Sequence, residues 1–72
     1  MAKLIGKGVY KRYSQERKLE HPILVQDLPK LLKLPKDLSE NLIVVRQNRK
    51  LNDDELIRDE DEIYFFLAVS GG

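Results

Sequence analysis

The sequence predicts an α+β domain in which a mixed sheet of four to five strands carries one helix on one face. Two patterns favour this fold class. Two sets of residues alternate along 63–69, as they do in a strand with two different faces. Leucines recur along 28–34 at the spacing of one helix face. The expected order is strand, strand, helix, strand, short strand, strand.

The N-terminal part is expected to form a hairpin. Residues 3–13 have a β-type composition, interrupted by two glycines, and predict the first strand. Ser14-Gln15-Glu16 is interpreted as a polar turn, and residues 17–20 as the second strand. Pro22 ends that strand because proline has no N–H to donate to a sheet.

A helix is expected after Asp27, which stands where an N-cap residue accepts hydrogen bonds from the first amides. Pro29 fits the first turn, where a missing amide costs little. Pro35 ends the helix. Its apolar stripe is formed by Leu28, Leu31, Leu32 and Leu34.

The second half begins with the β-branched block 42–45, which is typical of a central strand with both faces covered. A tight turn is expected around Asn48, and Leu51 is expected to begin a short edge strand. The acidic stretch 52–62 has few apolar residues, so it is interpreted as a loop anchored at one point.

The last strand is expected to place every second side chain in the core, and to present the residues between them on the other face. The expected core residues are Ile63, Phe65, Leu67 and Val69, and the others are Tyr64, Phe66 and Ala68. The strand runs directly into Ser70, Gly71 and Gly72. One domain, residues 1–69, is therefore expected to be followed by a flexible tail, residues 70–72.

Composition excludes several kinds of chemistry. The chain has 72 residues and no cysteine, which removes disulfides, thiolate catalysis and zinc clusters built on cysteine. No apolar run is long enough to cross a membrane, and no signal peptide is evident, so a cytoplasmic protein is expected. The net charge is +6 for residues 1–36 and −5 for residues 37–72, which indicates an electrically polar molecule.

The terminal glycines suggest a function for the tail. A tail of three small residues would hold the carboxylate of Gly72 about 10 Å beyond the domain. Residues without Cβ atoms can pass through a narrow channel in a partner enzyme. There the carboxylate can attack the α-phosphate of ATP to give an acyl-adenylate, which a sulfur nucleophile converts to a thiocarboxylate.

The segment 61–72, DEIYFFLAVSGG, closely resembles the C-terminus of the MoaD/ThiS family of ubiquitin-like sulfur carriers, above all that of molybdopterin synthase small subunits. Residues 25–28 and 44–48 are similar to the family's helix start and middle strand. The resemblance implies a β-grasp fold, and a Gly72 that a ubiquitin-activating-type enzyme adenylates and converts to a thiocarboxylate. Arg49 and Glu60 stand where the family often has glycine, and Leu67-Ala68 stand where the molybdopterin subunit commonly has prolines.

The resemblance also implies partners. The activating enzyme binds the ATP, and the sulfur then passes to an acceptor enzyme such as a molybdopterin synthase large subunit or a tRNA thiolase. A surface beside the tail, formed by Tyr64, Phe66 and Ala68, is expected to bind these partners, whereas Phe65 and Leu67 point into the core. The chain itself is expected to be a non-enzyme without cofactor or metal.

Two alternatives remain open at this stage. The first is a ubiquitin-like modifier joined through Gly72 to lysines of target proteins. The second is a small RNA-binding module that uses a basic segment with stacking rings, although nucleic acid is not the expected partner. Its residues would be Lys7, Lys11, Arg12, Arg17 and Lys18 with Tyr10 and Tyr13. The molybdopterin, tRNA-thiouridine and thiamine pathways are all open as the destination of the sulfur; the similarity of the tail favours the first, and the short body fits the other two as well.

Overall fold

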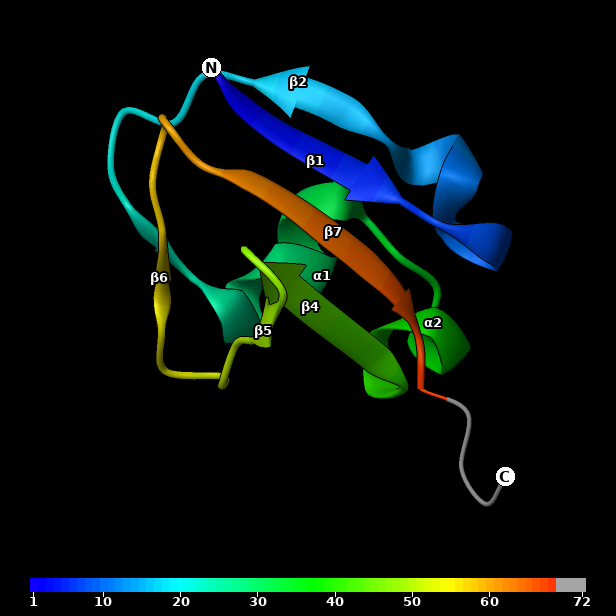
Figure 1. The fold of residues 1–72 in the computed structure, drawn as a ribbon. Coiled ribbons are helices and arrows are strands. Elements are labelled where there is room, and N and C mark those ends of the chain that lie inside the picture. The colour runs from blue at the N-terminus through cyan, green and yellow to red at the C-terminus, as the bar shows by residue number, and fades with distance from the viewer. Residues whose placement is uncertain (69–72) are drawn as a thin grey trace.

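Five strands form one mixed sheet in the order β2-β1-β7-β4-β5 in the computed structural model, which describes residues 1–68. These strands are β1 (Ala2–Gly6), β2 (Gln15–Arg17), β4 (Leu42–Arg46), β5 (Arg49–Lys50) and β7 (Glu62–Leu67). The middle strand β7 runs parallel to β1 and antiparallel to β4 (Figure 1). The predicted mixed sheet within an α+β fold is therefore confirmed.

A second, two-stranded sheet pairs β3 (Ile23–Leu24) with β6 (Leu56–Ile57), so the acidic stretch is not only a loop. The helical elements are the 3₁₀ turns η1 (Gly8–Tyr13) and η2 (Val25–Asp27) and the short helices α1 (Leu28–Leu32) and α2 (Lys36–Glu40). Both α-helices lie behind the sheet in the view of Figure 1. One face of the sheet is thus covered by helices.

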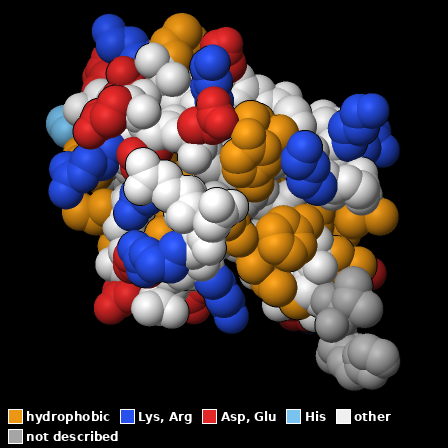
Figure 2. All heavy atoms as spheres, viewed as in Figure 1, with side chains coloured by type: hydrophobic (Ala, Val, Ile, Leu, Met, Phe, Trp, Pro, Cys, Tyr) orange, Lys and Arg blue, Asp and Glu red, His pale blue; other side chains and the backbone are white. Residues whose placement is uncertain are grey.

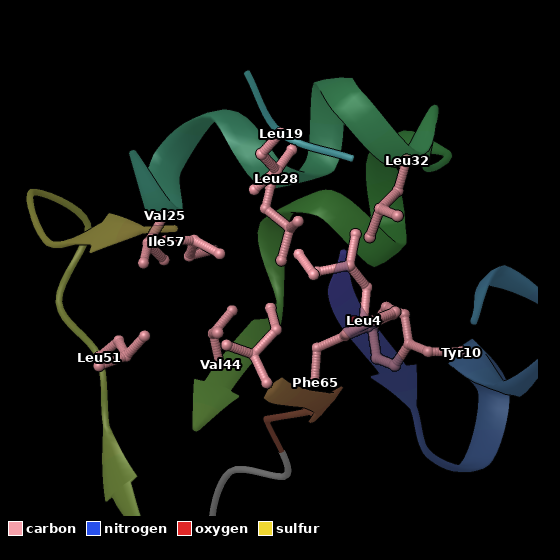
Figure 3. Close-up of a cluster of buried hydrophobic side chains, with 12 residues drawn as sticks. Leu4, Tyr10, Leu19, Val25, Leu28, Leu32, Val44, Leu51, Ile57 and Phe65 are labelled. Carbon is pink, nitrogen blue, oxygen red and sulfur yellow. The ribbon is translucent and has the colours of Figure 1, made fainter. Parts of the chain in front are cut away.

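The hydrophobic core lies between the sheet and these helices (Figure 3). Ile63 and Phe65 of the middle strand are fully buried, as the alternation predicts. Phe65 meets the ring of Tyr10 edge to face, with the centroids 5.7 Å apart. Leu28 and Leu32 are buried in the core, and Leu31 and Leu34 are partly buried against it, so the predicted leucine stripe is confirmed.

The predicted first strand over 3–13 is wrong in its second half, because β1 ends at Gly6. The chain then turns at Gly8, whose φ of +58° lies in the left-handed region that favours glycine. The turn η1 brings the backbone of Tyr10 so close to Gly6 that a Cβ on Gly6 would lie 2.1 Å from the Tyr10 carbonyl oxygen. Tyr10 therefore enters the core instead of lying on a strand.

The second strand is shifted toward the N-terminus relative to the prediction. β2 takes in Gln15 and Glu16, which were expected to form the turn, and ends at Arg17, where the predicted strand begins. Its register places Gln15 opposite Leu4. Ser14 fixes this geometry, because its hydroxyl accepts a hydrogen bond from the Gly6 N–H at 2.8 Å. Leu19 is buried outside any strand, and its N–H donates to Asp59 Oδ1 at 2.8 Å.

The predicted helix begins where expected but is shorter. Asp27 makes no capping hydrogen bond through its side chain, because η2 already brings it into helical conformation with φ −91° and ψ −6°. The helix ends at Leu32, because the next residue, Lys33, has a φ of +58°; Pro35 follows two residues later. A second helix, α2, follows Pro35, so the prediction of a single helix is wrong.

The strand β4 confirms the predicted block but is covered fully on one face only. Val44 is buried toward the helices, whereas Ile43 and Val45 are half-buried on the other face. Gln47 and Asn48 both have positive φ values, 52° and 62°, as a two-residue type I′ hairpin turn requires.

The short edge strand β5 ends before Leu51, so the prediction that Leu51 begins it is wrong. The hairpin turn is so tight that pairing with β4 starts at once, with Arg49 opposite Arg46. Leu51 comes after the strand, is buried, and donates its N–H to the Val44 carbonyl at 2.8 Å.

Candidate functional site

The predicted site residues that the structure describes lie on β7 and just after it. Tyr64 and Phe66 alternate with the buried residues of the strand and so face away from the helices. Ala68 follows the strand, and its N–H donates to the Asn41 carbonyl at 2.7 Å. Sheet-type pairing therefore continues one residue beyond β7. Val69 and the three tail residues, Ser70, Gly71 and Gly72, fall outside the described part of the chain.

Three further apolar side chains join Tyr64 and Phe66 on the sheet face that the helices leave uncovered. Ile5 and Val45 both lie opposite Tyr64 in the register, and Ile43 lies opposite Phe66. Figure 2 shows hydrophobic side chains gathered over β7 and β4 on this face. We call these five residues the outer patch: Ile5, Ile43, Val45, Tyr64 and Phe66.

Only two members of the outer patch, Tyr64 and Phe66, are predictable from the alternation along the last strand. Ile43 and Val45 stand in a run in which every residue is apolar, so the run does not show which side chains face outward. Antiparallel pairing of this run with the last strand, which was not predicted, would have been a signal, because pairing places outward residues opposite outward residues.

Polar contacts hold the ring of Tyr64 in place. The Lys7 ammonium lies 5.2 Å from the ring centroid, within the range of a cation–π interaction. The Tyr64 hydroxyl donates to Glu62 Oε2 at 2.9 Å, and this bond to the carboxylate raises the pKa of Tyr64. The outer patch therefore has a lysine at one border and a glutamate at another.

The prediction that Leu67 points into the core is wrong, because Leu67 is 37% exposed. It lies opposite Leu42 at the last pair of β4 and β7, beyond the Val44–Phe65 pair with which the buried core ends on these strands. Phe66 is exposed to the same degree. Two neighbouring large apolar side chains thus reach the surface just before the tail.

The acidic stretch uses several of its carboxylates to hold the backbone. Glu55 accepts from both terminal nitrogens of Arg49, at 3.1 and 2.6 Å, and from the Asn52 N–H, which lowers the pKa of Glu55 to about 2. Asp61 accepts from Arg46 and from the Arg58 N–H, both at 2.8 Å. These hydrogen bonds hold the backbone of the acidic stretch in place.

A similar bond lowers the pKa of Asp59, whose carboxylate accepts from the Leu19 N–H. In residues 1–68, no three histidine or acidic side chains gather as metal ligands would. Through the bond between Leu19 and Asp59, the acidic stretch joins the N-terminal half of the fold to the C-terminal half.

The basic segment lacks one of the rings that the RNA-binding hypothesis needs. Tyr10 is fully buried, and its hydroxyl donates to the Leu38 carbonyl at 2.9 Å. Tyr13 is half-buried, with the Arg12 guanidinium 5.7 Å from its ring centroid. Tyr10 therefore offers no ring face for a base to stack on, which leaves Tyr13 as the partly exposed ring of the segment.

His21 is exposed on the turn before β3. An open hollow of about 420 Å³ borders the outer patch, and its lining includes Arg46, which already donates to the Leu56 carbonyl and to Asp61. Within residues 1–68, no helix is long and apolar enough to span a membrane. What the site offers is an apolar surface beside the end of β7.

A scan against known protein families and a search of curated proteins both found no match to this chain.

Proposed function

We propose that the protein is a β-grasp sulfur carrier whose working group is the carboxylate of Gly72. The observation that carries the proposal is the position of β7. This strand occupies the middle of the sheet and ends at Leu67, five residues before Gly72. A rigid strand would thus deliver a short glycine-rich segment to a partner.

The proposed fold family rests on sheet topology. Two parallel strands in the middle, each with an antiparallel neighbour on its outer side, and short helices packed on one face are what a β-grasp domain requires. The short length of α1 and the added helix α2 would be local departures from that fold.

The proposed chemistry needs no side chain of the protein. The Gly72 carboxylate attacks the α-phosphorus of ATP bound to the activating enzyme, and pyrophosphate leaves with the electron pair of the broken P–O bond. Hydrosulfide, supplied by a sulfur donor, then attacks the carbonyl carbon of the acyl-adenylate. AMP leaves, and loss of the sulfur-bound proton gives the thiocarboxylate. The proposal requires Gly72 to carry a free carboxylate in the mature protein.

The outer patch is the proposed docking surface, with Phe66 as its anchor and with Tyr64 and Ala68 beside it. An aromatic side chain that is exposed in the free protein contributes strongly to binding when a partner removes it from water. Phe66 is 37% exposed and lies close to the point where the chain leaves the sheet. A partner that covers Phe66 is therefore near enough to receive the tail, because four residues beyond Ala68 span at most about 14 Å.

The proposal is tested by ATP–pyrophosphate exchange with the ubiquitin-activating-type enzymes of the same organism. Exchange that depends on the protein is expected with the wild type, and none with a variant that lacks Gly71 and Gly72. A second variant, Ser70→Ala, keeps the carboxylate and is expected to support exchange. Exchange by the truncated variant, or none by the wild type, would contradict the proposal.

The fate of the adenylate separates a carrier from a modifier. With a sulfur donor present, the carrier gains a thiocarboxylate that alkylating reagents trap. Products linked through Gly72 to lysine side chains, with no thiocarboxylate, would instead identify a ubiquitin-like modifier.

A further inference from the structure

The turn η1 lies at the same end of the sheet as the C-terminal end of β7. Strands β1 and β7 run parallel, so the residues that follow β1 lie beside the end of β7. The Lys7 N–H donates to the Phe65 carbonyl at 2.9 Å, which fixes the beginning of η1 against β7. Figure 1 shows η1, between β1 and β2, on the side of the sheet toward which β7 points.

Three exposed cations project from this end of the molecule: Lys7, Lys11 and Arg12. The stretch 7–12 contains no acidic residue. Among residues 1–68, the ion pairs use other cations, such as Arg46 with Asp61 and Arg49 with Glu55. The positive charge of η1 is therefore not neutralised within the described part of the protein, and it is available to a partner.

An apolar side chain stands between these cations. Val9 is 56% exposed, and η1 joins the outer patch through the contact between Lys7 and Tyr64. A surface that combines exposed aliphatic and aromatic groups with a cationic border fits a protein with an apolar centre and an acidic rim. A nucleic acid is less well matched, because it would leave Val9 unused and would find Tyr10 buried.

We infer that η1 docks on an acidic surface of the enzyme that activates Gly72, with Lys7, Lys11 and Arg12 facing carboxylates of that enzyme. This inference rests on the proposed function and adds the chemistry and orientation of the partner surface. Contact at η1 together with contact at the outer patch fixes the rotation of the domain about β7. The end of β7 then has the same orientation relative to the activating enzyme in every complex.

The test measures the KM for this protein in ATP–pyrophosphate exchange as a function of salt. The variant Lys7→Ala/Lys11→Ala/Arg12→Ala is expected to raise the KM about tenfold at low salt and to leave kcat unchanged, because charges at an interface rim act mainly on association. The wild-type KM is expected to rise with salt toward that of the variant. The matched control Lys30→Ala/Lys36→Ala/Arg58→Ala removes the same charge from exposed positions elsewhere and is expected to match the wild type.

Several outcomes would overturn the inference. One is a KM that is the same for the η1 variant and the wild type at every salt concentration. Another is equal loss in the η1 and control variants, which would indicate a general effect of net charge. Binding of an RNA oligonucleotide by the wild type and not by the η1 variant, with equal KM values, would assign η1 to nucleic acid. No exchange with any protein, the wild type included, would contradict the proposed function itself.

Discussion

The backbone N–H of Lys7 donates a hydrogen bond of 2.9 Å to the carbonyl oxygen of Phe65. This bond ties the residue after β1 to the middle strand, two residues before that strand ends. Because the two strands are parallel, the turn η1 is built directly against the place where the chain leaves the sheet. The surface features beside the end of β7 therefore depend on how tightly η1 packs.

The packing of η1 makes Gly6→Ala strongly destabilising. A Cβ at this position would lie 2.1 Å from the Tyr10 carbonyl oxygen and 2.9 Å from the Phe65 ring, and the backbone atom cannot move away cheaply. The free energy of unfolding is expected to fall by about 3 kcal/mol, in the upper range for overpacking, as measured by urea denaturation.

Gly8→Ala is the matched control for Gly6→Ala. A Cβ at Gly8 meets no atom within 4 Å, so only the positive φ of +58° opposes it. The expected loss is about 1 kcal/mol. Equal losses for the two variants would contradict the close approach of η1 to β1.

The two neighbouring phenylalanines are expected to separate stability from binding. Phe65→Ala empties the middle of the core and should lower the free energy of unfolding by about 3–5 kcal/mol. Phe66→Ala removes a partly exposed side chain and should lower it by less than about 1.5 kcal/mol, while raising the KM for activation at least tenfold. A Phe66→Ala variant as unstable as Phe65→Ala, or one activated normally, would contradict the role of the outer patch.

Stability is expected to depend on pH through Glu55. Its pKa is lowered from an ordinary 4.5 to about 2, chiefly by the hydrogen bonds from Arg49 and then by the Asn52 N–H. A lowered pKa means that the contribution to stability is complete above pH 4.5 and is lost as the pH falls toward 2. Glu55→Gln should therefore unfold at lower urea concentration than the wild type at neutral pH, and the difference should shrink over that interval.

Arg49→Gln provides the control for the pH experiment, because it removes the partner and leaves the carboxyl group. It is expected to lose most of the same pH dependence. A constant difference between the wild type and Glu55→Gln at all pH values would contradict the proposed cause.

Tyr10→Phe is expected to weaken the attachment of η1 to the segment around α2. The Tyr10 hydroxyl donates to the Leu38 carbonyl at 2.9 Å, and the variant leaves that carbonyl without this donor. The expected loss is about 1 kcal/mol in the free energy of unfolding. Hydrogen exchange of the η1 amides should speed up with it, whereas unchanged stability and exchange would show that the bond contributes nothing.

Elements that depend on local pattern were predictable from the sequence. The alternation along the last strand correctly placed Ile63 and Phe65 inward, because every second side chain of a strand points to the same face of the sheet. The start of the helix at Leu28 was equally clear from Pro29 and the leucine spacing. The side of the sheet that carries Tyr64 and Phe66 followed from the same alternation.

Features that depend on distant contacts were not predictable. Val9 and Tyr10 have strand-type side chains, but Gly8 turns the chain and the core takes up the ring of Tyr10. β2 lies earlier than expected because Ser14 bonds to Gly6 across the turn. Leu67 has the alternation of a core residue, yet the buried core ends at the Val44–Phe65 pair, two pairs before it.

The most direct test of the account is intact-mass spectrometry of the protein isolated from its native cells, compared with a variant that lacks Gly71 and Gly72. The account predicts a species heavier than the unmodified chain by the difference between one sulfur and one oxygen atom, and its absence from the variant. An unmodified mass for the wild type, unchanged after incubation with ATP, the activating enzyme and a sulfur donor, would contradict it.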